Sequence, residues 1–133
     1  MKITLIKPDV IYKDKLQNIK NLEILFSQAG EVGSLIILPE LFSTGYIFEN
    51  KEVIHALCED FSDSPTIQAL QRIALQYQST IVAVIAQKEG GQFFNSVVVV
   101  DGSGLQYTYQ KISQTLLGYK RAVNSTFSEV TRY

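Results

Sequence analysis

Hydrophobic and polar residues recur along the chain with two different periods, and this pattern predicts an α/β protein. An apolar opening over residues 3–7, closed by Pro8-Asp9, predicts a strand. After Asp14 the apolar residues lie three or four apart, which is the spacing of a helix with one buried face; they are Leu16, Ile19, Leu22, Leu25 and Phe26. Gly30 and Gly33 end this predicted helix.

The same two periods continue to residue 110. The apolar run 34–38 predicts a strand covered on both faces, as in a sheet flanked by helices, with Pro39 ending its ladder. Ser64-Pro65 supplies an N-cap and a first-turn proline for a helix with apolar positions Ile67, Leu70, Ile73, Ala74 and Tyr77. Strands are then predicted over 80–86, 93–101 and 105–110, with turns at 89–91 and 101–104. The predicted order is β-α-β-α-β-β-β, with helices packed on a sheet whose later strands form hairpins.

Two segments carry no clear period. The stretch between Pro39 and Ser64 is irregular and rich in Phe, Tyr and Gly, and residues 112–133 are polar, so neither strand nor helix is predicted there.

Composition narrows the class of partner. The chain has 133 residues, 46% of them hydrophobic, and a net charge of −1, so it fits one domain or part of one and has no excess of basic side chains for nucleic acid or an anionic membrane. No apolar run approaches the roughly 20 residues of a membrane helix, and residues 1–7 do not read as a signal peptide. The single Cys cannot form an internal disulfide, which favours the cytoplasm. No Cys/His cluster has metal-ligand spacing, so neither a metal nor another cofactor is expected.

Glu40 and Lys111 are the strongest candidates for chemistry. Glu40 directly follows a predicted buried strand, where open α/β sheets build their sites and where desolvation raises a carboxyl pKa toward the range of a general base. Lys111 follows the last predicted strand in the same way, so the two side chains are expected to meet above one sheet edge, a proton acceptor beside a positive charge suited to an oxyanion. The alternatives are a solvated carboxylate and a surface lysine closing a hairpin.

Three other features favour ordinary structural readings. Cys58 lies three residues after His55, which is weak evidence for a catalytic pair, and a free Cys is commonly a small buried hydrophobe. The aromatic residues Phe42, Tyr46 and Phe48 either line a substrate pocket or cover the sheet end, which is their commoner use. Gly102-Ser-Gly104 joins two strands and is a hairpin turn, not a dinucleotide fingerprint.

Three stretches together resemble the nitrilase superfamily of carbon–nitrogen hydrolases, in its amidase-like branch. Residues 35–46 (LIILPELFSTGY) resemble its first signature, and residues 94–104 (FNSVVVVDGSG) followed by Tyr109-Gln-Lys111 are similar to its middle segment. The opening, residues 4–9 and 14–21, is similar to the starts of amidase-like members. The resemblance runs from about residue 1 to residue 111 in the family's order.

This resemblance implies a fold and a mechanism. The fold is a four-layer α-β-β-α sandwich, of which this chain is expected to be the N-terminal half with an atypical C-terminal tail. The mechanism uses a Cys-Glu-Lys triad in which a thiolate attacks a small amide or nitrile and water releases the acyl group. Glu40 matches the general base and Lys111 the oxyanion-stabilising lysine. The loop beside the substrate matches Phe42, Thr44, Gly45 and Tyr46.

The chain departs from the family pattern after Lys111. No cysteine segment follows the lysine, Cys58 does not match the nucleophile, and residues 118–121 (GYKR) stand where many members carry a second glutamate. We therefore expect a partial hydrolase domain over 1–111, a divergent tail over 112–133, and little or no activity of the chain alone, whether a premature stop, a frameshift or truncation is the cause. The alternative is a non-catalytic module that covers its exposed sheet face by self-association or with a partner. A flavodoxin-like nucleotide binder is weaker, because the chain lacks a glycine-rich strand-to-helix loop.

Overall fold

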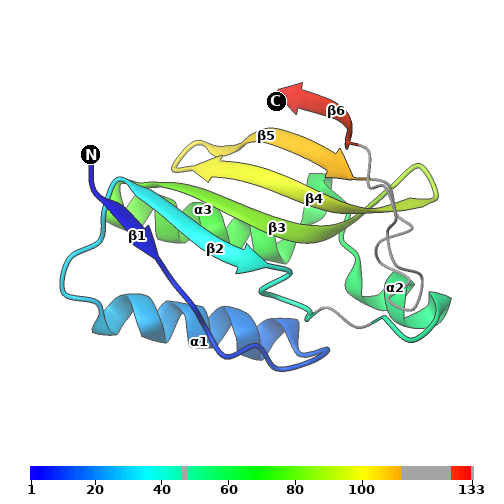
Figure 1. The fold of residues 1–133 in the computed structure, drawn as a ribbon, viewed down its shortest axis with the longest axis horizontal. Helices are drawn as coiled ribbons and strands as arrows, with labels where there is room; N and C mark the ends of the chain where they lie inside the picture. The colour runs from blue at the N-terminus through cyan, green and yellow to red at the C-terminus, as the bar shows by residue number, and fades with distance from the viewer. Residues whose placement is uncertain (46–47, 112–126, 133) are drawn as a thin grey trace.

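The computed structural model describes residues 1–45, 48–111 and 127–132, with side chains described as far as residue 110. Its elements, in chain order, are β1 (Ile3–Leu5), α1 (Lys15–Gln28), β2 (Leu35–Glu40), α2 (Lys51–Leu57), a 3-10 turn (Phe61–Asp63), α3 (Pro65–Tyr77), β3 (Thr80–Glu89), β4 (Gln92–Asp101), β5 (Gly104–Lys111) and β6 (Phe127–Arg132). The strands form one sheet in which spatial order follows chain order, from β1 to β6 (Figure 1). The α/β class and the hairpins of the later strands are confirmed.

The sheet is mixed. β1, β2 and β3 run parallel, and β3 to β6 pair antiparallel. Consequently β2 and β5 point the same way, and both end at the same end of the sheet. This places the last residue of β2, Glu40, and the last residue of β5, Lys111, at one end.

Both long helices begin at the residues that the sequence indicates. The Asp14 side chain accepts a hydrogen bond from the Gln17 amide at 3.1 Å at the start of α1. Ser64 accepts from the Ile67 amide at 3.1 Å at the start of α3, and Pro65 occupies the first turn. α3 ends at Gln78, which adopts the left-handed conformation with φ 51°.

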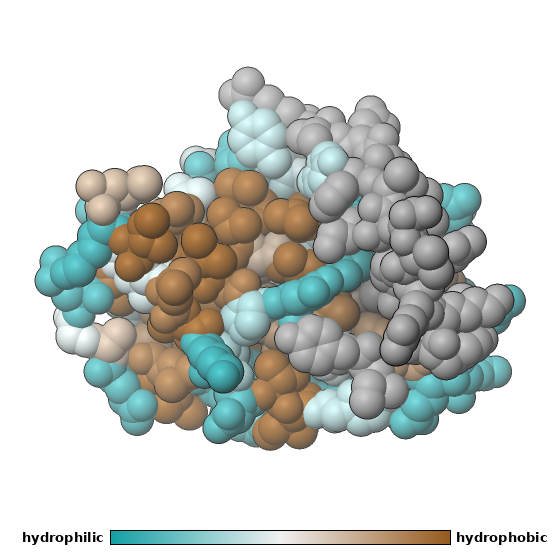
Figure 2. All heavy atoms as spheres, viewed as in Figure 1, coloured by the Kyte–Doolittle hydropathy of each residue, from teal (hydrophilic) through white to brown (hydrophobic). Residues whose placement is uncertain are grey.

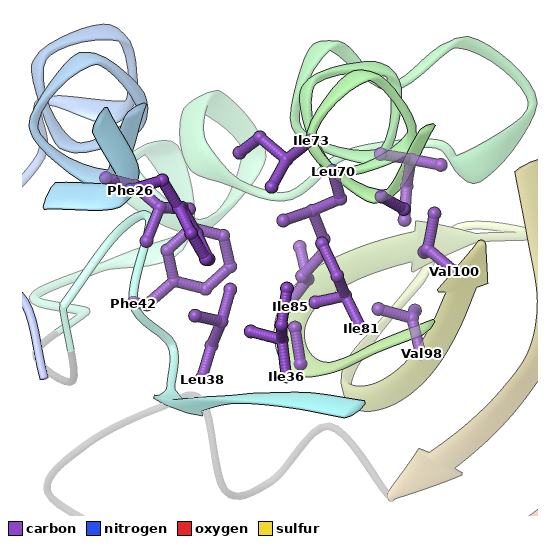
Figure 3. Packing of buried hydrophobic residues seen from close by; sticks show 14 residues of the cluster. Phe26, Ile36, Leu38, Phe42, Leu70, Ile73, Ile81, Ile85, Val98 and Val100 are labelled. Carbon is purple, nitrogen blue, oxygen red and sulfur yellow. The ribbon is translucent and has the colours of Figure 1, made fainter. Parts of the chain in front are cut away.

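The main core lies between the sheet and the two helices α1 and α3, which cover the same face (Figure 3). α1 contributes Leu22 and Phe26, and α3 contributes Leu70 and Ile73. The sheet contributes alternate residues, since neighbouring side chains of a strand point to opposite faces; they are Ile36, Leu38, Ile81, Ala83, Ile85, Val98 and Val100. Because Ile36 and Leu38 of β2 are part of this core, the core holds β2 in place up to the sheet end where Glu40 lies.

The opposite face of the sheet is partly open. At one end α2 covers it through a second cluster of Leu41, Phe48, Ile54, Leu57, Cys58 and Ala86. Over β1 and β2, however, Ile3, Leu5 and Ile37 are 51%, 74% and 37% exposed, and Figure 2 shows a hydrophobic patch on this side of the molecule. The prediction that residues 34–38 are covered on both faces is therefore wrong for the described part of the chain, because both packed helices lie on one side.

Three local predictions are also corrected. β2 continues through Pro39 to Glu40, because a register shift between Ile37 and Glu40 accommodates the proline. α2 forms within the stretch predicted to be irregular, with the Asn50 side chain accepting from the Val53 amide at 2.9 Å. β6 forms within the tail, where no strand was predicted, by pairing with the edge of β5. Both elements are short, and tertiary contacts decide them more than the local pattern does.

Candidate functional site

Glu40 ends β2 in a tightly held bend. The next residue, Leu41, has φ 51°, and its amide donates to the Val84 carbonyl of β3 at 3.0 Å. The amides of Thr44 and Gly45 return to the Leu41 carbonyl at 3.3 and 2.9 Å. The bend turns the chain away from the sheet and leaves the Glu40 side chain exposed, so the predicted desolvation of this carboxylate is wrong for the described structure.

Asn95 of β4 contacts the Glu40 carboxylate directly. Asn95 Nδ2 donates to Glu40 Oε1 at 2.5 Å, although β3 lies between the strands that carry them. Asn95 is 4% exposed and is directly opposite Lys111 in the β4–β5 register. The strand order separates Glu40 from Lys111 by β3 and β4, and Asn95 of β4 lies between the two positions along the sheet.

Some of the predicted site lies outside the described residues. The backbone of Lys111 is described but its side chain is not, and Tyr46 is not described at all. The same holds for residues 118–121, where the sequence pattern departs from the family. The roles predicted for these positions stay predictions.

Phe42 and Thr44 are buried and line no surface. Phe42 is 0% exposed and packs in the helix-side core beside Phe26 and Leu38, as Figure 3 shows. Thr44 is also 0% exposed, and its hydroxyl donates to the Gly45 carbonyl at 3.1 Å. Phe48 belongs to the second cluster. Phe42 and Phe48 thus cover the sheet end, which was the alternative to lining a pocket. Neither Phe42 nor Thr44 is exposed to bind a substrate, as was predicted for both.

Asn18 of α1 holds the loop that follows Glu40, a role that the sequence analysis did not assign. Its side-chain amide donates to the Ser43 carbonyl at 2.8 Å and to the Ile11 carbonyl at 2.7 Å, and its Oδ1 accepts from the Ile11 amide at 2.7 Å. The residue is 2% exposed. The available signal was a polar side chain directly before Ile19 of the buried stripe; for Asn95 it was the Phe94-Asn-Ser stretch.

A charged pair supports the same loop from outside. Lys13 Nζ lies 3.2 Å from Glu49 Oε2, and the Lys13 amide donates to the Thr44 carbonyl at 3.2 Å. The hydrogen bond from Lys13 lowers the pKa of the Glu49 carboxyl. Both side chains are well exposed, so the pair orients the loop more than it stabilises the fold.

Cys58 has the environment of a structural thiol. It caps the C-terminus of α2, where its amide donates to the Ile54 carbonyl at 2.9 Å, and it is 3% exposed. Burial raises the pKa of the Cys58 thiol to about 12. His55, the candidate base, lies edge-on to the ring of Phe93, with ring centroids 4.6 Å apart. A nucleophile needs an accessible thiolate, which this position does not provide near neutral pH.

Over the described ranges 1–45, 48–111 and 127–132, no group of three or more His, Cys, Asp or Glu side chains converges to hold a metal ion. In the same part of the chain, no helix combines the length and the apolar character needed to cross a membrane.

Comparison with known proteins gives a family match over nearly the whole chain. The carbon–nitrogen hydrolase family matches residues 2–127. A protein named nitrilase from Pyrococcus abyssi (strain GE5 / Orsay) is 36% identical over 106 residues, which are 79% of this chain and 40% of that protein. The matched part of the chain thus spans less than half the length of this curated relative.

Solved structures show the same fold at lower sequence identity. The CN-hydrolase superfamily protein XC1258 from Xanthomonas campestris, solved with an arsenic adduct in its active site, has a TM-score of 0.75 at 24% identity, over 96% of this chain and 46% of that one. An N-terminal amidase has a TM-score of 0.75 at 20% identity, over 89% of this chain and 30% of that one. The described sheet and helices therefore match part of a larger fold.

Proposed function

Because the chain belongs to the carbon–nitrogen hydrolase family, we propose that it supplies two of the charged groups of a hydrolytic site that acts on the C–N bond of a small amide. Glu40 serves as the general base, and Lys111 stabilises the oxyanion of the tetrahedral intermediate. The observation that carries this proposal is the arrangement at one end of the sheet, where Asn95 hydrogen-bonds Glu40 and is paired in register with Lys111.

The complete reaction also needs a nucleophile, and we propose that this chain does not carry it. Its one cysteine is Cys58, which is buried and has a raised pKa. Without a thiolate no acyl-enzyme forms, and Glu40 and Lys111 can only orient and polarise a substrate. The 133-residue chain alone is therefore expected to be inactive.

Ammonia release from short ω-amides tests the second proposal. The purified chain is expected to release none above the background of a Glu40→Gln, Lys111→Met double variant. Turnover that Cys58→Ala abolishes would contradict it, because the buried thiol would then be the nucleophile.

A chimera tests the first proposal. In the Pyrococcus abyssi relative, the part that corresponds to residues 2–111 of this chain, which lie within the family match, is replaced by these residues. We expect the chimera to hydrolyse an amide and to lose that activity with Glu40→Gln or Lys111→Met, while Glu52→Gln, an exposed glutamate of α2, leaves it unchanged. Equal activity in all these variants would overturn the assigned roles.

The open sheet face favours a second candidate function, a non-catalytic module that pairs with a second copy of itself. Leu5, Ile37 and Tyr107 are 74%, 37% and 38% exposed. By the strand register they share the face not covered by α1 and α3. These exposed side chains are uncharged, so packing two copies of the face together would remove apolar area from water without bringing like charges together.

Sedimentation equilibrium discriminates this candidate. Self-association at micromolar concentration is expected to be weakened by Ile37→Lys and not by Leu16→Lys, which puts the same charge on the exposed side of α1. A monodisperse monomer of the folded wild-type chain would contradict it.

A further inference from the structure

The side chain of Asn95 presents two different hydrogen-bonding atoms to two different neighbours. A carboxylate only accepts hydrogen bonds, so the contact with Glu40 requires the Asn95 amide nitrogen and fixes the orientation of the whole amide group. Asn95 Oδ1 is thereby turned elsewhere. It is buried and has no hydrogen-bond partner among the described residues.

An unpaired buried acceptor costs free energy, which favours a donor in the assembled site. The register gives a candidate, because position 111 lies directly opposite Asn95 on β5. Residues directly opposite each other on an antiparallel pair share a sheet face, with Cβ atoms about 4.5–5.5 Å apart. The residue at this position is lysine, whose ammonium group has three donors and no acceptor.

The burial of Asn95 and the chemistry of its amide group indicate that its contact with Glu40 positions the carboxylate. Asn95 is 4% exposed, whereas Glu40 is exposed, so the amide is the fixed partner and the carboxylate is the one that is held. An amide does not titrate, and it can therefore contact a base and an ammonium group without competing with either for a proton.

We propose that Asn95 is a positioning residue of the hydrolytic site, holding the Glu40 carboxylate through Nδ2 and accepting from the Lys111 ammonium through Oδ1 when the site is assembled. The proposal rests on the proposed function for its catalytic meaning. In this arrangement, Asn95 of β4 sets the distance between the charged groups of Glu40, which ends β2, and Lys111, which ends β5. Aspartate at this position would accept only, and would place a second negative charge beside Glu40.

Nuclear magnetic resonance of the 133-residue chain, labelled with nitrogen-15 and carbon-13, tests the contacts without any turnover. The Asn95 side-chain amide protons are expected to shift with pH as the Glu40 carboxylate is protonated, and Glu40→Gln is expected to remove this dependence. Glu52→Gln, which changes an exposed glutamate of α2, is expected to leave this dependence unchanged. Asn95 amide protons that do not respond to pH in the folded wild-type chain would overturn the proposal.

Lysine variants of the chimera, in which the site is assembled, test the contact of Asn95 Oδ1 with Lys111. Lys111→Met removes the donors and is expected to move the Asn95 carbonyl carbon resonance, Lys111→Arg is expected to restore it, and Lys88→Met, on β3, is expected to leave it unchanged. Equal effects of Lys111→Met and Lys88→Met would overturn the assignment of Oδ1.

The chimera gives the catalytic readout. Asn95→Leu is expected to lower kcat on the order of 100-fold, because misplacement by about 1 Å costs that much, with a small change in KM. Unchanged kcat would overturn the positioning role while leaving the roles of Glu40 and Lys111 standing. An inactive parent chimera would count against the proposed function and not against the resonance measurements.

Discussion

Asn18 and Ser43 are joined by a 2.8 Å hydrogen bond between the Asn18 side-chain amide and the Ser43 carbonyl, and this contact ties α1 to the loop that follows Glu40. The same amide group also binds both backbone polar groups of Ile11. One buried side chain thus holds two loops at the end of the sheet where the candidate site lies.

Replacing Asn18 with leucine should destabilise the fold. The change leaves the buried Ser43 carbonyl and the two partly buried backbone groups of Ile11 without their partner, and a cost of about 2–4 kcal/mol in the free energy of unfolding is expected. Urea unfolding monitored by circular dichroism measures it. Asn21→Leu, one turn along α1 at a partly exposed position, should cost under about 1 kcal/mol. Equal midpoints for the two variants would contradict the assigned clamp.

Gly33 is expected to tolerate no side chain. A Cβ atom there would lie 2.2 Å from the Lys2 carbonyl oxygen, which belongs to backbone and cannot rotate away. Gly33→Ala should therefore push β1 from β2 and lower the unfolding free energy by about 2 kcal/mol or more. Gly30→Ala is the matched control, since nothing lies within 4 Å of its added Cβ. Hydrogen exchange of the β1 amides locates the damage, and intact protection in Gly33→Ala would refute the prediction.

Cys58 should resist alkylation in the folded chain and react readily once urea unfolds it. Its pKa is raised to about 12 from an ordinary value of 9.0, mainly by burial. The folded state therefore holds the thiol proton more tightly, so this contribution to stability is complete below pH 9 and is lost as the pH rises through about 12. The difference in unfolding free energy between wild type and Cys58→Ala should shrink over that range. Fast iodoacetamide labelling of the native chain at pH 7 would disprove the assigned burial.

Glu59 is expected to be important for stability, although it lies away from the candidate site. It is 5% exposed, and its carboxylate accepts from the Ser64 hydroxyl at 2.9 Å and from the Thr66 amide and hydroxyl at 3.2 and 2.5 Å. Glu59→Leu removes these acceptors at the start of α3 and should cost about 2–4 kcal/mol. Thermal unfolding measures the loss. Glu52→Leu, on the exposed side of α2, should cost far less, and similar losses would argue against the network.

The sequence predicts the long helices and strands, and it does not predict elements whose formation depends on contacts between residues far apart in the chain. Ser64-Pro65 and the spacing of Leu70 and Ile73 are local signals, and α3 begins at Pro65. β6 forms by pairing with β5, and the local pattern of hydrophobic and polar residues gives no signal for this strand.

The candidate site shows the same division. The position of Glu40 after an apolar strand indicates its place at a sheet end, but its exposure depends on the bend at Leu41. The contact with Asn95 joins residues 55 positions apart, so it requires the register of three strands and not a motif.

Because each strand of the sheet pairs with the strand that precedes it in the chain, the fold needs few distant encounters before it begins to gain contacts. The β3–β4 and β4–β5 hairpins have the shortest loops to close, so they are expected to nucleate folding, with the parallel pairings β1–β2 and β2–β3 added later. Assembly would then run from the middle of the sheet toward its amino-terminal edge, and the bond between Glu40 and Asn95 would be among the late contacts to form.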